Sequence, residues 1–435
     1  MPATLAALRS AFPAEGLFAE KDFLHSPEPL RLDAKIVEEL EKLGHRLQLF
    51  QRACNELYYR SLNGKAPAWV ADYCDRGKPA DLLDFARQKK FRADLPQIIR
   101  PDLLLTPDGF AITELDSVPG GIGLTGWLSK TYAALGHDVL GGGEGMITGF
   151  RSILGENADI LVSDESATYR PEMKWLARMA NDAGAKWRVE RAEEFVIRHP
   201  SSVIPPALYR FFELFDLPNI PSAPALMEQM LAGSVRITPP MKPWLEEKLW
   251  LALFWSRPLR EYWRRELSER HFLELQKHIP MSWVLDPAPL PHHAVLPGLE
   301  INDWRELSAF SQKQRDLVLK ISGFSPQAWG SRGVVVGTDV PQTEWAAAVE
   351  SALTDFAEHP HVLMRFAHTR IVEHPYFDPA TGEIRTMRGR VRLCPYYFVN
   401  DGNTKLGGAL ATIVPADKKI VHGMKDAILT AVAAG

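Results

Sequence analysis

Four charged side chains in one short segment have the types and the spacing of a divalent-metal site. The segment RPDLLLTPDGFAITELDSVPGG contains two strand-like runs joined by a Pro-Asp-Gly turn. A three-residue hairpin loop at that turn places Asp102 opposite Glu114 and Arg100 opposite Asp116. Because side chains alternate along a strand, all four lie on one face of the hairpin. The opposite face is expected to pack into a core through Pro101, Leu103, Leu105, Ala111 and Leu115.

The charges on this hairpin face do not balance. Three carboxylates and one arginine leave a formal charge of −2. At a separation of roughly 5 Å and an effective dielectric constant near 20, one like-charge pair costs about 3 kcal/mol. Carboxylate oxygens suit a hard ion such as Mg²⁺, which is usually shared with substrate phosphates. The alternative is a solvated hairpin face that carries an Arg–Asp pair.

A glycine pattern follows the hairpin. The sequence GIGLTG, from Gly121 to Gly126, matches GxGxxG. That pattern is a dinucleotide fingerprint only when its strand belongs to a parallel β-α-β unit, and here the preceding strand belongs to an antiparallel hairpin. The backbone amides at this helix start also suit a phosphate or a carboxylate. A simple tight turn is the third interpretation.

A second informative stretch is LVLKISGFSPQAWGSRGVVVG, from Leu317 to Gly337. It predicts a strand that contains Lys320, a loop with three glycines, and a second strand over 334–336. A lysine beneath a glycine loop can neutralise phosphate oxygens, and the glycines let backbone amides approach them. The stretch lacks GxxxxGK[ST], and no helix follows the loop, so it is not a Walker loop. An ordinary hairpin with a long loop and an exposed lysine is the alternative.

Together these motifs resemble the circularly permuted ATP-grasp ligases, in particular the group similar to glutathionylspermidine synthetase. The features in common are an R-x-D strand, an E-x-[N/D] strand twelve residues after the aspartate, and a distant K-x-x-G…G-x-x-G loop. In that group the acidic strands precede the lysine and the glycine loop, as they do here. The resemblance covers residues 95–130 and 240–400 and implies ATP and Mg²⁺ as cofactors.

The resemblance implies a role for each charged residue of the hairpin. Arg100 is expected to bind the γ-phosphate of ATP, and the carboxylates of Asp102, Glu114 and Asp116 are expected to hold Mg²⁺. Asp116 stands where the group usually has asparagine, which adds a negative charge.

In the second stretch, the resemblance implies that Lys320 contacts ATP phosphates. A flexible lid is implied over Gly323, Gly330 and Gly333. A second ATP lysine is expected at the edge of an upstream helix, for which we choose Lys248 and hold Lys242 in reserve. The glutamine expected in the adenine-linker strand is not evident, and no amidase half is visible.

The elements that must position these residues indicate a mixed α/β fold. We expect an ATP-grasp fold in permuted order with a small Rossmann-like α/β domain. The predicted division is 1–150 for N-terminal helices and the acidic hairpin, 151–235 for the small domain, and 236–435 for a helical segment and the lysine–glycine half. A strand over 159–163, a helix from Pro171 to about Ala185 and the strand KWRVERAEEF form the predicted β-α-β unit.

Composition permits an enzyme and says little about which kind. The chain has 435 residues, 46% hydrophobic and 24% charged, with a net charge of −4. That balance gives no support to a nucleic-acid or membrane-surface partner. Three scattered cysteines are typical of reduced thiols in the cytoplasm. No apolar run approaches the ~18 residues of a spanning helix. The sequence does not define the oligomeric state.

The expected function is an ATP-dependent carboxylate–amine, or carboxylate–thiol, ligase. It would form an acyl phosphate and release ADP and phosphate, with a small carboxylate and a small amine or thiol as substrates. Two alternatives are a non-catalytic nucleotide-binding module of the same fold and a nucleotide-independent hydrolase with a carboxylate pair. Arg388, Arg390 and Arg392 share one strand face, which can bind a substrate anion or simply answer nearby acids.

Overall fold

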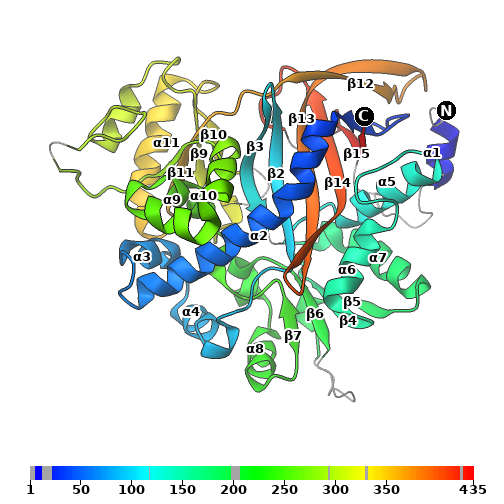
Figure 1. The fold of residues 1–435 in the computed structure, drawn as a ribbon, viewed down its shortest axis with the longest axis horizontal. Coiled ribbons are helices and arrows are strands. Elements are labelled where there is room, and N and C mark those ends of the chain that lie inside the picture. The colour runs from blue at the N-terminus through cyan, green and yellow to red at the C-terminus, as the bar shows by residue number, and fades with distance from the viewer. Residues whose placement is uncertain are drawn as a thin grey trace. The chain divides into compact units, whose positions relative to one another are not determined.

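The computed structural model describes residues 5–11, 22–116, 118–196, 206–291, 294–328, 332–421 and 425–435. The chain forms two compact units. Unit 1 comprises residues 1–48, 94–241 and 369–435, and unit 2 comprises residues 49–93 and 242–368. Figure 1 shows the ribbon of both units. The three-part division drawn from the sequence stays a prediction.

Unit 1 contains a seven-stranded sheet in the order β1-β15-β14-β13-β2-β3, with β12 paired to the first part of β13. All pairs are antiparallel except β1 with β15. The strands are β1 Leu30–Leu32, β2 Ile98–Thr106, β3 Gly109–Asp116, β12 Ile371–Phe377, β13 Ile384–Asn400, β14 Asn403–Pro415 and β15 Ile428–Ala434.

The hairpin β2–β3 has the predicted cross-strand pairs but a different turn. Thr106 pairs with Gly109, so the loop has two residues and not the predicted three. An irregularity then adds one extra residue, Thr113, to β3, after which Asp102 faces Glu114 as predicted. Before the bulge the faces are exchanged, so Ala111 lies opposite Leu104, on the face that carries Asp102, although its side chain is buried as predicted.

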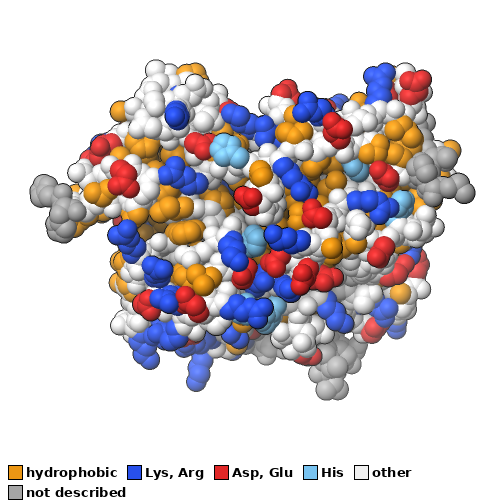
Figure 2. Space-filling model, turned by 45° about the horizontal axis from the view of Figure 1, so that its top comes forward, with side chains coloured by type: hydrophobic (Ala, Val, Ile, Leu, Met, Phe, Trp, Pro, Cys, Tyr) orange, Lys and Arg blue, Asp and Glu red, His pale blue; other side chains and the backbone are white. Residues whose placement is uncertain are grey.

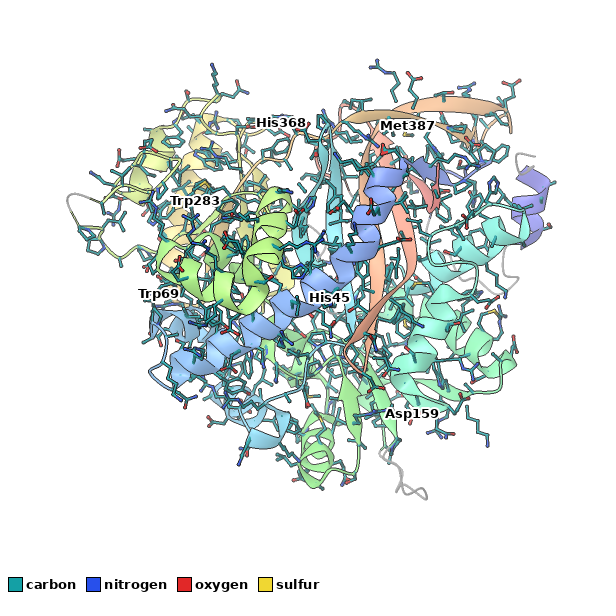
Figure 3. The ribbon with its side chains drawn as sticks, viewed as in Figure 1. His45, Trp69, Asp159, Trp283, His368 and Met387 are labelled. Atoms are coloured by element: carbon teal, nitrogen blue, oxygen red, sulfur yellow. The ribbon has the colours of Figure 1, made fainter. Side chains whose placement is uncertain are left out.

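The second sheet of unit 1 is parallel, in the order β5-β4-β6-β7. This confirms the predicted β-α-β unit. Asp159 of β4, labelled in Figure 3, accepts two hydrogen bonds from Arg188 of β5, at 2.7 and 2.8 Å. The elements are β4 Asn157–Val162, α7 Arg170–Asp182, β5 Lys186–Arg191, β6 Ala207–Phe211, α8 Ala223–Ala232 and β7 Arg236–Thr238.

Two helices join the sheets of unit 1 into one core. α5 (Ile122–Ala134) and α6 (Gly145–Leu154) contact β14 of the large sheet on one side and α7 on the other. Their buried side chains belong to one hydrophobic cluster with residues of both sheets. The short helix α1 (Leu5–Ala11) adds Leu8 to the same cluster.

Unit 2 is built on a four-stranded antiparallel sheet in the order β10-β9-β11-β8. One face packs on α11, where Trp283 of β8, labelled in Figure 3, joins the buried cluster. The other face packs on α9. The elements are α3 Trp69–Asp75, α4 Ala80–Ala86, α9 Leu249–Trp255, α10 Arg260–His278, β8 Ser282–Val284, β9 Leu317–Ile321, β10 Val334–Val336, α11 Gln342–Thr354 and β11 His361–Arg365.

A long helix, α2 (Ala34–Leu62), has residues in both units. The sequence predicts it from apolar positions at the helical period after Asp33. All six of those side chains are buried: Ile36, Leu40, Leu43, Leu47, Phe50 and Leu57.

The face drawn in Figure 2 carries interspersed acidic and basic side chains, as a nearly balanced composition predicts. No helix among the described residues is long and apolar enough to cross a membrane.

Candidate functional site

The charged hairpin residues form one contact network with a residue of β13. Arg100 pairs with Asp102 at 3.0 Å and also with Asp116. On the other side, Arg392 of β13 pairs with Asp102 at 3.1 Å. Glu114 lies directly opposite Asp102 in the strand register. We call this set, Arg100, Asp102, Glu114, Asp116 and Arg392, the acid–arginine face.

Arg392 changes the charge count made from the sequence. Two arginines and three carboxylates leave a formal charge of −1 on the acid–arginine face. The other arginines of the predicted row do not join it. Arg388 is exposed and lies 3.8 Å from Glu373, and Arg390 donates to the carbonyl of Ala416 at 2.9 Å. The row is therefore divided between Arg392, which contacts the hairpin acids, and two arginines that make other contacts.

Burial and crowding shift the pKa values of this face. Burial raises the pKa of Asp116, and the charges of Glu114 and Asp102 raise it further, whereas Arg100 opposes that shift. Burial lowers the pKa of Arg100, but Asp102 and Asp116 outweigh it and hold that pKa well above its ordinary value. The guanidinium is therefore a permanent charge here, and an added cation would favour the charged form of Asp116.

One residue of β13 lies between the two arginines. The Cys394 thiol is 3.5 Å from the Asp102 carboxylate and accepts from Arg100 at 3.4 Å. Burial, followed by the charge of Asp102, raises the pKa of Cys394 to about 11. The side chain is therefore a neutral thiol at pH 7, which makes it a packing group and not a nucleophile.

Three hairpin acids are the implied ligands for Mg²⁺. Among the described residues, Asp102, Glu114 and Asp116 do not bring three ligand atoms within 4.8 Å of one another. One oxygen of Asp102 faces Arg100 and the other faces Arg392. Asp116 pairs with Arg100 as well. Carboxylates suit Mg²⁺, which usually takes one or two of them plus substrate phosphates. Binding of Mg²⁺ by these three acids stays a prediction, because Asp102 and Asp116 must each first lose a contact with Arg100.

The GxGxxG pattern has a packing explanation. Leu124 at the start of α5 donates its N–H to the carboxylate of Glu172 on α7, at 3.0 Å, and Glu172 is fully buried. A Cβ on Gly123 would lie 2.6 Å from the Glu172 carbonyl oxygen, and one on Gly126 would lie 2.7 Å from Trp175. The carboxylate expected at this helix start is thus supplied by the chain itself, and the preceding strand is antiparallel. The pattern does not form a dinucleotide fingerprint.

Lys320 lies near the end of β9, opposite Val334 of β10 and Val362 of β11. Val362 packs against Leu249 and Ala252 of α9. Because opposed side chains share a face, Lys320 lies on the side of the sheet that α9 covers. The strand–loop–strand prediction for this stretch is confirmed.

Ser322, the first residue after β9, ties this strand to the start of α9. Its carbonyl accepts the N–H of Lys248 at 3.1 Å, and its hydroxyl accepts the N–H of Leu249 at 2.8 Å. The same hydroxyl donates to the carboxylate of Glu247. We call these contacts the Ser322 junction. It holds Lys248 at the first turn of α9 beside the strand that carries Lys320, so the two predicted ATP lysines belong to one local structure.

The two lysines considered for the upstream position differ in surroundings. Lys248 lies at the edge of α9 and donates to the carbonyl of Ala328 in the glycine loop, at 3.2 Å. Lys242 is 1% exposed and donates to Asn55 at 3.1 Å and to the Arg92 carbonyl at 3.0 Å. Lys242 thus serves the interior of unit 2, and Lys248 has the predicted place at a helix edge.

Two of the loop glycines are required by close packing. A Cβ on Gly323 would lie 2.9 Å from the Glu246 carbonyl oxygen and 3.0 Å from the Glu247 carboxyl carbon. A Cβ on Gly333 would lie 2.8 Å from the Gln327 carbonyl oxygen, which also accepts the Gly333 N–H. Gly330 lies outside the described residues. The predicted lid role of the three glycines stays a prediction.

Sequence reasoning missed two residues of these networks. Arg392 was named with Arg388 and Arg390 as a row that binds an anion or pairs with nearby acids, and Arg392 does pair with Asp102. Glu172 and Lys78 were not considered, and Lys78 forms a buried ion pair with Glu247 at 2.5 Å. A single arginine at the start of the mainly apolar run RLCPYYFV is a usable signal for Arg392. No local pattern marks the other two residues.

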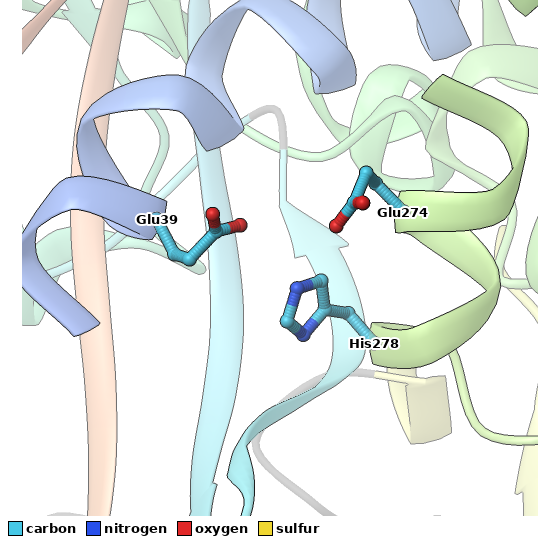
Figure 4. A group of neighbouring side chains, drawn as sticks. All are labelled: Glu39, Glu274 and His278. Atoms are coloured by element: carbon cyan, nitrogen blue, oxygen red, sulfur yellow. The ribbon is translucent and has the colours of Figure 1, made fainter. Parts of the chain in front are cut away.

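Figure 4 labels three further titratable side chains, Glu39 of α2 and Glu274 and His278 of α10. Glu39 accepts from Arg46 of its own helix at 2.8 Å, and Glu274 accepts from Lys277 at 2.7 Å. Each carboxylate is thus engaged by a cation of its own helix, and neither is assigned a catalytic role.

No protein-family model matches the sequence, and no curated protein is similar to it in sequence. Among solved structures, a glutathione synthetase-like effector from Globodera pallida in its apo form matches with a TM-score of 0.55 at 11% identity, over 100% of both chains. A "putative gamma-glutamylcysteine synthetase" from Methylobacillus flagellatus KT matches with a TM-score of 0.42 at 12% identity, over 84% of this chain and 87% of that one. The mixed α/β fold of this chain is thus similar to that of the effector over its whole length.

Proposed function

We propose that this chain is an ATP-dependent ligase that joins a small carboxylate to an amine or a thiol. The reaction passes the γ-phosphoryl group of ATP to the carboxylate, and the nucleophile then displaces phosphate from the acyl phosphate. The observation that carries this proposal is the Ser322 junction, which sets Lys248 beside the strand of Lys320 under a glycine loop. Two lysines at one loop suit a polyphosphate, because phosphoryl transfer depends mainly on positioning and charge neutralisation.

In this proposal each set of residues has a separate task. Lys248 and Lys320 bind phosphate oxygens of ATP, and Arg100 neutralises charge on the γ-phosphoryl group as it moves. Asp102, Glu114 and Asp116 would hold Mg²⁺. Mg²⁺, when bound, neutralises phosphate oxygens and orients them for in-line transfer.

Two further observations support this assignment. The fold is similar to that of a glutathione synthetase-like effector, although that likeness concerns the fold alone. The acidic hairpin precedes the lysine strand along the chain, which is the order of the circularly permuted ATP-grasp ligases. Permutation, ATP and Mg²⁺ are all parts of the proposal.

A non-catalytic nucleotide-binding module is the second candidate. Both oxygens of Asp102 face arginines, which favours a charge-balanced structural network over an open metal site. The two candidates differ in turnover: both bind Mg-ATP, but only the ligase releases ADP when a suitable acid and amine are present.

Thermal unfolding with Mg-ATP tests the nucleotide site. A ligand at 100 times its Kd stabilises the native state by about 2.7 kcal/mol, so wild type is expected to melt at a higher temperature. Lys320→Ala and Lys248→Ala should each remove most of that increase. Lys313→Ala, at an exposed position seven residues before Lys320, is the matched control and should keep it. Equal stabilisation in all four proteins would contradict the proposed site.

A further inference from the structure

A buried ion pair lies directly behind the Ser322 junction. Lys78, between α3 and α4, is 2.5 Å from the carboxylate of Glu247, and each side chain is only 1% exposed. Both residues belong to unit 2. Glu247 immediately precedes Lys248, so the ion pair reaches the start of α9 through a single peptide bond.

The same pair contacts the glycine loop. Glu247 accepts from the Ser322 hydroxyl, and its carboxyl carbon is so close to Gly323 that a Cβ there would lie at 3.0 Å. The Lys78 ammonium lies 5.7 Å from the centre of the Phe324 ring. Residues 322–324 therefore contact the Lys78–Glu247 pair. The first turn of α9 follows Glu247 directly in the chain.

A contribution to the stability of the fold does not explain why these two buried residues are charged. The desolvation of two opposite charges costs about as much free energy as their attraction contributes. Replacing such a pair by apolar side chains of the same size often leaves the protein equally stable. With 1% of its side chain exposed, Lys78 is closed off from any ligand in this structure. Its effect must reach a binding site through the groups that it touches, which are Glu247 and the loop.

We propose that Lys78 is a positioning residue for the phosphate-binding lysines. It holds the Glu247 carboxylate on Ser322, which fixes the start of α9 on the end of β9. It also keeps that carboxylate from pairing with Lys248, the next residue, and so preserves the positive charge that ATP phosphates require. This inference rests on the proposed function, since it assigns Lys78 to the nucleotide site of that function.

The test uses calorimetric titration of the full chain with Mg-ATP. Lys78→Met keeps the length of the side chain and removes its charge, so the Glu247 carboxylate is left to pair with Lys248. The Kd for ATP is expected to rise roughly tenfold. Adding Glu247→Gln to that variant removes the stray charge and keeps an acceptor for Ser322. The double variant is therefore expected to return to within about twofold of the wild-type Kd.

This rescue separates positioning from a merely structural role. If Lys78 only supported the fold, the double variant would bind ATP no better than the single one, and that result overturns the inference. If Lys78→Met does not fold, the Kd of the uncharged double variant for ATP is the test. A Kd like that of wild type supports the inference. Weak ATP binding by a folded double variant overturns it. Lys78→Arg, which keeps the charge, should bind within a few-fold of wild type.

The proposed function fails in a different way. If wild type shows no heat of binding with Mg-ATP, both the function and the inference are overturned. If wild type binds, Lys320→Ala does not, and Lys78→Met binds like wild type, then the function stands and the inference alone is wrong.

Discussion

The hydroxyl of Thr113 donates to the carbonyl oxygen of Asp102 across the hairpin, at 3.1 Å. Thr113 is the extra residue of the β-bulge, so its side chain binds the backbone at the point where the register changes. Beyond this point Asp102 faces Glu114 and Arg100 faces Asp116. The bulge therefore sets the pairing of the acid–arginine face.

Thr113→Val tests this role of the bulge. Valine has nearly the same shape but no hydroxyl, so the Asp102 carbonyl loses a hydrogen bond. The free energy of unfolding should fall by about 1 kcal/mol. Urea denaturation measures it, with Thr106→Val beside the turn of the same hairpin as the control. A larger loss at Thr106 than at Thr113 would contradict a stabilising role for the bulge bond.

The hairpin also shows how far the sequence could be read. The pairs at Asp102 and Arg100 were predicted correctly from a three-residue loop that does not exist. The real loop is one residue shorter, and Thr113 restores the count. Bulge positions depend on contacts that a local pattern does not encode, which is why Ala111 was assigned to the wrong face.

Other parts of the site depend on long-range contacts. Arg392 reaches Asp102 across 290 positions of sequence, and Lys78 reaches Glu247 through the fold of unit 2. Turn residues and the alternation of side chains along a strand identify strands and loops. The glycines between β9 and β10 correctly predicted the position of that loop. The pairing of charged side chains that are distant in sequence is decided only when the strands and helices pack.

Gly123→Ala tests the packing explanation of the glycine pattern. Alanine favours a helix by about 1 kcal/mol over glycine. However, its Cβ would lie 2.6 Å from the carbonyl oxygen of Glu172, a fully buried residue of α7. We expect a net loss of about 2 kcal/mol in unfolding free energy, since overpacking outweighs propensity. Lys130→Ala, at an exposed position of the same helix, should change it by less than about 0.5 kcal/mol.

Asp116→Asn tests the crowding of carboxylates. The folded-state pKa of Asp116 is raised, so the folded protein binds this proton more tightly than the unfolded chain does. The stability that this proton contributes is present below the unfolded pKa and is lost as pH rises through the folded pKa. Relative to wild type, the asparagine variant should therefore gain stability as pH rises from about 4 toward 7. Denaturation at several pH values measures it, and a difference that does not change with pH would contradict the shift.

His374 of β12 gives the opposite pH dependence. It is 4% exposed, bonded to Ser26 at 2.9 Å, and burial lowers its pKa to about 4. The unfolded chain therefore binds this proton more readily, and stability falls as pH drops from 6.5 through 4. The loss attributable to this group should reach about 3 kcal/mol. In His374→Gln, this part of the pH dependence of the unfolding free energy should be absent. An unchanged pH dependence would show that other groups cause it.

Glu114→Gln tests the chemistry assigned to the hairpin. The substitution keeps the size of the side chain and removes a charge that raises the pKa of Asp116, so the protein should stay folded. Turnover should fall by about a hundredfold or more, because a metal-binding carboxylate acts on charge that develops during transfer. Glu373→Gln, on an exposed part of β12, is the control. With a suitable acid and amine, wild type should release ADP and phosphate. Release of AMP and pyrophosphate would show adenylate chemistry, and equal turnover in wild type and Glu114→Gln would leave the acid–arginine face with a structural role only.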